Sequence, residues 1–251
     1  MNASSSEYSS ASNGTFQKAS HITPALLVKS FDELESGIKL VSKKVTLVQI
    51  DVVDGVFVQN KTWPFVGDGH GNFAKIVKQE VGLPDWEECE FEIDLMVSKP
   101  AFEADKWIAA GASYIVVHLR SVTIGEYEEI GKAIQDKGVK LVLGLAADVT
   151  LEEAASYMDK VMPEGVQCMG IKHIGFQGQK FDETVADRIK AIRAKYPDVE
   201  ISVDGGMGNV DAVALVRDAG ANRVIAGSAV FGSGRPIDTI AEFEEVMTEG
   251  K

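Results

Sequence analysis

The sequence predicts a single (β/α)8 barrel, a closed ring of eight parallel strands surrounded by helices. Short apolar runs alternate with helical patterns eight times along the 251 residues, which is typical of parallel strands joined by right-handed helical crossovers. Polar residues also recur at alternate positions near the C-terminal ends of several strands. The alternative fold, a doubly wound open sheet, would have nearly continuous apolar strands, so the barrel is favoured.

The expected elements follow one another as strand and then helix throughout the chain. The first helix should begin at Ser30, because Ser30 and Glu33 form the pattern of a capping box. The strands are expected at residues 22–28, 46–52, 89–96, 114–119, 140–146, 166–171, 200–204 and 223–226. The helices are expected at residues 30–42, 72–81, 101–110, 126–136, 151–162, 182–195, 209–219 and 237–246. Residues 1–20 are rich in Ser, Asn and Ala and are predicted to be a disordered tail, which leaves residues 21–251 for the barrel.

The composition limits the partners of the chain. Its 38 acidic residues outnumber the 25 Lys and Arg and give a formal net charge of −13. This charge repels nucleic acids and anionic membranes, so neither is expected as a partner. An anionic substrate must then be held locally by backbone N–H groups, a helix N-terminus or a metal. The two cysteines lack the spacing of a metal site and indicate reduced thiols. No apolar run of about 18 residues and no targeting pattern occurs, so a soluble, cytoplasmic protein is predicted.

Acidic residues occupy the inward face of three expected strands. Side chains alternate between the two faces of a strand, so Asp51 points the same way as Gln49, and Asp94 and Asp204 take equivalent places on two other strands. Active sites of (β/α)8 barrels lie at the C-terminal ends of the strands, where these three acids are expected to meet. Like charges this close must hold a proton, hold a cation, or do both. Asp54, in the turn that follows the second strand, is expected to cap that turn.

Glycine-rich segments follow the sixth, seventh and eighth expected strands. Glycine lets the backbone approach a ligand closely and point N–H groups at an anion, and barrels often bind phosphate at the loops after strands seven and eight. These segments therefore predict a phosphate site. The residues expected to form it are Gly175, Phe176, Gln177, Gly178, Gly205, Gly206, Gly227 and Ser228.

Several segments of the chain resemble those of the ribulose-phosphate 3-epimerase family, whose members are TIM barrels that bind ribulose phosphates. The resemblance extends in order over about residues 22 to 233. The matching segments are Ile50-Asp51-Val52-Val53-Asp54-Gly55 with Phe57-Val58 and Asn60, Asp94-Leu95-Met96, Val117-His118, Gly175-Phe176 with Gly178-Gln179-Lys180-Phe181, Val203-Asp204-Gly205-Gly206, and Ala226-Gly227-Ser228-Ala229-Val230-Phe231.

The resemblance implies roles for several residues. In the family, the acids that match Asp51 and Asp204 are the paired acid/base groups, and a divalent metal held by them and by two histidines stabilises an enediolate. The phosphate binds the glycine loops, and His118 is expected to be one of the substrate-binding residues. A homo-oligomer is also implied.

Four residues depart from the family pattern. Gln49 and Asp94 replace the two metal-binding histidines, Ala25 replaces a substrate-contacting serine, and Arg120 replaces the glutamate two places after His118. The expected metal ligands are therefore all oxygen donors, namely Gln49, Asp51, Asp94 and Asp204. Such a set favours Mg²⁺ or Mn²⁺ over Zn²⁺ or Fe²⁺, for which imidazole is the better ligand.

The predicted function is epimerisation at C3 of a ketopentose phosphate, of the ribulose 5-phosphate and xylulose 5-phosphate type, by two carboxylates through an enediolate. One alternative is a lyase or aldolase that forms a Schiff base on Lys172 of the sixth strand, although that lysine is more simply interpreted as a salt-bridge partner of the acids. The decarboxylase and hexulose-phosphate synthase relatives would instead need an Asp-x-Lys-x-x-Asp run, which the third strand lacks. The other alternative is a non-catalytic sugar-phosphate-binding barrel, against which the retention of Asp51 and Asp204 argues.

Overall fold

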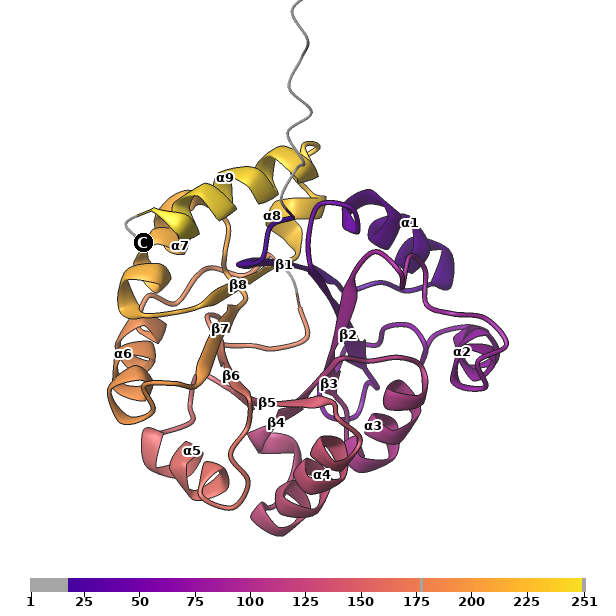
Figure 1. Cartoon of the computed structure of the whole chain (residues 1–251), viewed down its shortest axis with the longest axis horizontal. Helices are drawn as coiled ribbons and strands as arrows, with labels where there is room; N and C mark the ends of the chain where they lie inside the picture. Colours follow the sequence, from indigo (N-terminus) through magenta and orange to yellow (C-terminus); the bar gives the residue numbers. More distant parts are fainter. Residues whose placement is uncertain (1–17, 177, 250–251) are drawn as a thin grey trace, which may run out of the picture.

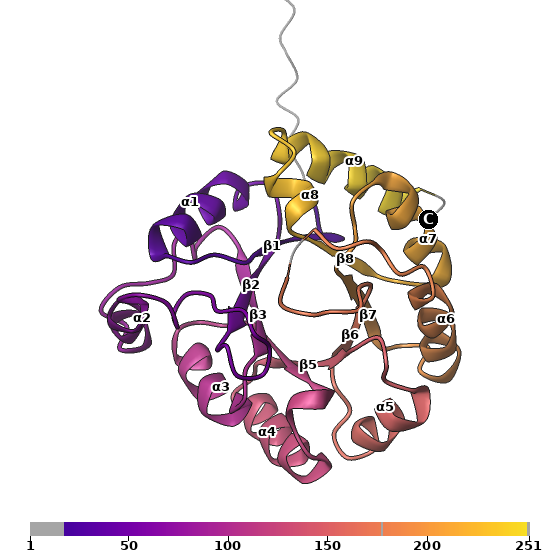
Figure 2. The same cartoon turned by 180° about the vertical axis from the view of Figure 1, so that it is seen from behind.

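The computed structural model, which describes residues 18–176 and 178–249, is a closed barrel of eight parallel strands (Figure 1). Each strand pairs with the next one in the chain, and β1 (Ile22–Leu26) pairs with β8 (Arg223–Ala226) to close the ring. Views from both ends show the helices outside the ring (Figures 1 and 2). The fold predicted from the alternation of strands and helices is confirmed. Within the described ranges, no helix combines the length and the apolar character needed to cross a membrane.

The other elements alternate around the ring. The strands are β2 (Leu47–Val53), β3 (Glu90–Met96), β4 (Tyr114–His118), β5 (Lys140–Leu145), β6 (Gly165–Met169) and β7 (Glu200–Asp204). The helices are α1 (Phe31–Val41), α2 (Gly69–Val77), α3 (Pro100–Ala109), α4 (Ile124–Asp136), α5 (Leu151–Met158), α6 (Val185–Lys195), α7 (Val210–Ala219), α8 (Ser228–Phe231) and α9 (Pro236–Thr248), with a 3-10 turn at Leu119–Ser121.

Most expected boundaries agree within a few residues, and β6 shows why some do not. This strand ends at Met169 rather than at residue 171, because the carbonyl of Gly170 accepts from the N–H of Asp182 at 2.8 Å instead of continuing the sheet. A Cβ at position 170 would lie 2.5 Å from the carbonyl oxygen of Gly205, so only glycine fits there. The short helix α8, directly after β8, was not predicted.

Side-chain caps begin four of the helices in the described ranges, α1, α4, α5 and α7. Thr123 and Thr150 begin α4 and α5 with complete capping boxes. At α1, Ser30 Oγ accepts from the N–H of Glu33 at 3.2 Å, as expected. The Glu33 carboxylate accepts from the N–H of Lys29 at 2.7 Å. A complete capping box would have it accept from the N–H of Ser30, one residue later.

The barrel interior contains a buried ion pair, in contrast to the apolar layer between the strands and the helices. Arg223 donates two hydrogen bonds of 2.7 Å to Glu92, one of 3.0 Å to Thr23 and one of 2.9 Å to Glu200. Glu92 precedes Asp94 by two residues on the same face of β3, so the pair lies one layer from the acids, toward the N-terminal ends of the strands. Each charge is compensated by a partner in good geometry, as a buried ion pair requires.

Candidate active site

The three predicted acids meet near the C-terminal end of the barrel. Asp51 lies in β2, Asp94 pairs with it in β3, and Asp204 is the last residue of β7. One carboxylate oxygen of each residue lies within 4.8 Å of the other two. Asp94 is fully buried, Asp51 is nearly so, and Asp204 is partly exposed. The alternation of side chains along three strands therefore brings these acids into one cluster.

Two glutamine side chains hold the acids together. Gln49 donates from Nε2 to Asp51 Oδ1 at 2.9 Å and to Asp204 Oδ2 at 3.4 Å. Gln167 of β6 donates from Nε2 to Asp94 Oδ2 at 2.7 Å and to the same oxygen of Asp204 at 3.4 Å. Both amide oxygens are buried without a hydrogen-bond partner in the described part of the chain. Gln167 was not among the predicted site residues, although the alternation of side chains along the sixth strand would have placed it on the inward face.

His118, at the end of β4, is a partner of Asp94. Its Nε2 lies 2.7 Å from Asp94 Oδ1, and its ring packs against Phe57 with the ring centroids 5.8 Å apart. Gly144 of β5 leaves room for the imidazole, because a Cβ there would lie 2.7 Å from His118 Nδ1. The imidazole is 1% exposed and does not line the pocket described below. His118 therefore lies behind the acid cluster rather than on the substrate side, where the resemblance placed it.

Burial raises the pKa of two of the acids. For Asp51, desolvation and the negative charge of Asp94 raise the pKa to about 7, although the hydrogen bond from Gln49 opposes the rise. For Asp204, desolvation and the charges of Asp51 and Asp94 raise the pKa well above its ordinary value. An ionised carboxylate is unfavourable in a buried site beside like charges. The cluster therefore retains a proton near neutral pH unless a cation replaces it.

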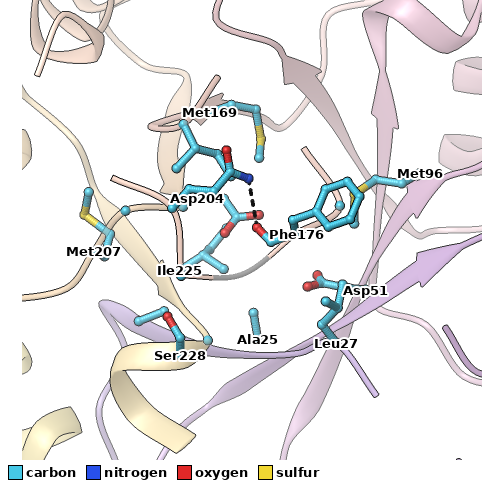
Figure 3. A pocket seen from close by; sticks show the side chains of 18 residues that line it. Ala25, Leu27, Asp51, Met96, Met169, Phe176, Asp204, Met207, Ile225 and Ser228 are labelled. Carbon is cyan, nitrogen blue, oxygen red and sulfur yellow. Dashed lines mark hydrogen bonds between the residues drawn. The ribbon is translucent and has the colours of Figure 1, made fainter. Parts of the chain in front are cut away.

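A pocket at the C-terminal ends of the strands gives access to Asp51 and Asp204 (Figure 3). The glycine loops after β6, β7 and β8 form much of its wall. Of the predicted phosphate-binding residues, those in the pocket lining are Gly175, Phe176, Gly178, Gly205, Gly206, Gly227 and Ser228. Gln177 lies outside the described residues. The apolar part of the lining consists of Ala25, Leu27, Met96, Met169, Ile171, Met207, Ile225 and Ala226.

The loop after β7 presents bare backbone to this pocket. Gly205 and Gly206 have φ values of 89° and 77°, a region that residues with a side chain rarely adopt. A Cβ on Gly206 would lie 2.7 Å from the Cα of Phe181, and one on Gly205 would lie 2.7 Å from the side chain of Ile171. Neither position has room for a side chain, so peptide groups form this part of the wall, as an anion site of backbone N–H groups requires.

Two cationic side chains considered from the sequence are outside the pocket lining. Lys172 is exposed, a position that supports neither an ion pair with the acids nor a Schiff base in the pocket. Arg120 donates to Asp148 at 3.1 Å and to Glu153 at 3.0 Å, both on the loop and helix after β5. In β3, Met96 lines the pocket where the Asp-x-Lys-x-x-Asp run would place its lysine.

The acid cluster offers a set of donors that fits a divalent cation. Three carboxylates converge, and the buried oxygens of Gln49 and Gln167 have no partner in the described ranges. A half-turn of a side-chain amide exchanges its nitrogen and its oxygen. Such a turn would direct an oxygen toward the acids, an arrangement that a cation between them would make favourable.

The fold and the site together define a barrel of the kind found in enzymes, with buried carboxyl groups suited to acid/base chemistry at the C-terminal ends of its strands. The sequence pattern of the ribulose-phosphate 3 epimerase family matches residues 21–231. The chain therefore belongs to the ribulose-phosphate 3-epimerase family, and it is an isomerase of the class that acts on carbohydrates.

Individual relatives agree with this assignment. The chain is 28% identical over 224 residues to the cytoplasmic isoform of ribulose-phosphate 3-epimerase of Oryza sativa, a match covering 89% of this chain and 92% of that one. It is 30% identical over 247 residues to ribulose-phosphate 3-epimerase of Candida glabrata, covering 92% of this chain and 94% of the relative. The crystal structure of 3-hexulose-6-phosphate synthase from Salmonella typhimurium superposes with a TM-score of 0.69 at 17% identity, covering 92% of this chain and 100% of that one. The last likeness shows a shared fold.

Proposed function

We propose that the protein interconverts the two C3 epimers of a ketopentose phosphate, of the ribulose 5-phosphate and xylulose 5-phosphate type. The observation that carries this proposal is the shared pocket of Asp51 and Asp204, two carboxyl groups with raised pKa values. They come from β2 and β7, which are separated in the ring by β1 and β8. Inversion at one carbon needs a proton acceptor on one face and a proton donor on the other, and two groups on separate strands suit this need.

In the proposed reaction, Asp51 and Asp204 exchange the proton at C3. The ionised member of the pair removes this proton, which the neighbouring C2 carbonyl acidifies, and an enediolate forms. The protonated member then delivers a proton to the opposite face of C3. Burial and mutual repulsion support the required difference in protonation, because the two acids do not ionise independently. Without a bound cation, Gln49 donates to both carboxylates and so links the two groups.

A divalent cation at the acid cluster is part of the proposal. Asp51, Asp94, Asp204 and Gln49 would hold it, and Mg²⁺ or Mn²⁺ is favoured over Zn²⁺ or Fe²⁺ because every donor is an oxygen. When bound, such a cation supplies positive charge that stabilises an enediolate.

The phosphate group of the substrate is proposed to bind the glycine loops after β6, β7 and β8. Backbone N–H groups suit this role, because the net charge of −13 gives no long-range attraction for an anion. The lining by Gly178, Gly206 and Gly227, from three separate loops, supports a site of this kind.

A cytoplasmic location and a homo-oligomeric assembly complete the proposal, without nucleic-acid or membrane partners. Cys89 and Cys168 are buried free thiols, as expected of a protein in a reducing compartment.

The function is tested by incubating the enzyme, supplied with Mg²⁺ or Mn²⁺, with ribulose 5-phosphate in deuterated water and following C3 by NMR. Xylulose 5-phosphate carrying deuterium at C3 is the expected product. Absence of exchange at C3 with each divalent cation would refute the proposal. A covalent adduct trapped on Lys172 by borohydride would favour the Schiff-base lyase instead.

A further inference from the structure

A hydrogen bond, here called the strap, joins two loops beside the pocket. Asn60, in the loop between β2 and α2, donates from Nδ2 to the backbone oxygen of Gly175 at 2.8 Å. Gly175 belongs to the loop between β6 and α6 and lines the pocket. In both end-on views this second loop lies across the barrel toward β1 and β2 (Figures 1 and 2). The strap therefore connects segments that are far apart in the sequence.

The partners of Asn60 fix the orientation of its amide. Asn60 Oδ1 accepts from Lys29 Nζ at 2.6 Å and from the N–H of Lys61 at 2.9 Å. A lysine ammonium and a backbone N–H can only donate, and the carbonyl of Gly175 can only accept, so the nitrogen of the amide must face Gly175. The positive charge of Lys29 on the amide oxygen also polarises the amide and strengthens the bond from its nitrogen.

Packing reinforces the hydrogen bond. Gly175 has a φ of 82°, and a Cβ there would lie 2.6 Å from a methyl carbon of Val58 in the β2–α2 loop. The same loop has a second anchor away from the pocket, where Asp54 accepts from the N–H and the hydroxyl of Ser98, both at 2.7 Å. Asp54 also accepts from the N–H of Val56 at 2.7 Å, which confirms the predicted turn cap.

We propose that Asn60 is a positioning residue that fixes Gly175, and with it the glycine loop after β6, against the acid pocket. Asn60 does not line the pocket, so it acts through Gly175. Asp51 lies in the strand that leads into the loop of Asn60, so the strap sets the distance between the acid cluster and the glycine loop. The consequence is selective affinity for a phosphorylated substrate. This inference rests on the proposed function, in which the glycine loop takes part in phosphate binding.

Two substitutions at position 60 and one matched control test the inference. Asn60→Ala removes the strap, whereas Asn60→Asp keeps an acceptor for Lys29 and places an oxygen against the carbonyl of Gly175. The control is Ser98→Ala, which removes the hydroxyl bond of the second anchor of the same loop. The measurements are the affinity of the full chain for inorganic phosphate by titration calorimetry, KM and kcat for ribulose 5-phosphate, and the midpoint of thermal unfolding.

Both Asn60 variants should weaken phosphate binding and raise KM by about tenfold or more, since the carbonyl of Gly175 loses its donor. Their kcat should change by less than about threefold, because the acids are untouched. Ser98→Ala should leave phosphate binding and KM unchanged. Wild-type affinities in both Asn60 variants, or an equal loss in Ser98→Ala, would overturn the inference and leave the proposed function standing. A parent enzyme that binds no phosphate and epimerises no phosphorylated ketose would overturn the proposed function itself, and the inference with it.

Discussion

Replacing Asp51 by Asn should change how the stability of the metal-free protein depends on pH. The pKa of Asp51 is about 7 in the folded chain against an ordinary value of 3.8, so the folded chain binds this proton more tightly than the unfolded chain does. The stability that this proton contributes is complete below the unfolded pKa and is lost as the pH rises toward 7. Each pH unit of difference is worth about 1.4 kcal/mol, so the loss amounts to about 4 kcal/mol. Asn cannot ionise and should remove this loss.

The assay is urea unfolding of parent and Asp51→Asn proteins in the presence of a chelator, from pH 4.5 to pH 8. The free energy of unfolding of the variant, relative to the parent, should increase up to about pH 7 and level off above it. Excess Mg²⁺ or Mn²⁺ should stabilise the parent most at high pH, because a bound cation replaces the proton, and should stabilise the variant less. Parallel curves for the two proteins without metal would refute the assignment of the raised pKa to Asp51.

Three further experiments probe the site. Asp204→Asn should lower turnover by about 10² or more, the range for loss of a positioned acid or base; epimerisation near the parent rate would contradict the two-base mechanism. Gln49→His combined with Asp94→His should shift metal preference toward Zn²⁺ or Fe²⁺ in a competitive titration, and an unchanged preference would count against this ligand set. Gly206→Ala should lower the thermal unfolding midpoint more than Gly178→Ala, because a Cβ at position 206 lies 2.7 Å from backbone and one at position 178 meets nothing within 4 Å; equal midpoints would disprove this difference.

The fold and the acid cluster could be predicted because both depend on local periodicity. Eight repeats of a strand and a helix allow few topologies, and a closed ring then places the end of every strand at one rim. The inward direction of Asp51, Asp94 and Asp204 follows from counting alternate positions, and the structure brings all three within 4.8 Å. The glycine loops were found because glycine is needed where the backbone itself forms a wall.

Other features depend on partners that sequence spacing does not specify. Gln167 becomes part of the cluster only because β6 lies beside β7, where its amide reaches two acids from different strands. The contact of Asn60 forms only when the loop of Gly175 is brought next to it in the folded chain. The end of β6 at Met169 likewise depends on the bond from the N–H of Asp182, in the loop before α6, to the carbonyl of Gly170. These contacts form between residues that are distant in the sequence and meet only in the folded barrel. A local sequence pattern therefore does not predict them.

The closure of the barrel by its first and last strands also determines the order in which the site can form during synthesis. Ala25 of β1 and Ala226 of β8 both line the pocket, and Thr23 of β1 bonds to Arg223 of β8 at 3.0 Å. A nascent chain that has not yet released β8 from the ribosome already contains all three acids, but it has no complete pocket around them. It also leaves the edges of β1 and β7 unpaired, and open strand edges are places where chains associate wrongly. Pairing of β8 with β1 and β7 therefore removes the unpaired strand edges and completes the pocket in the same step.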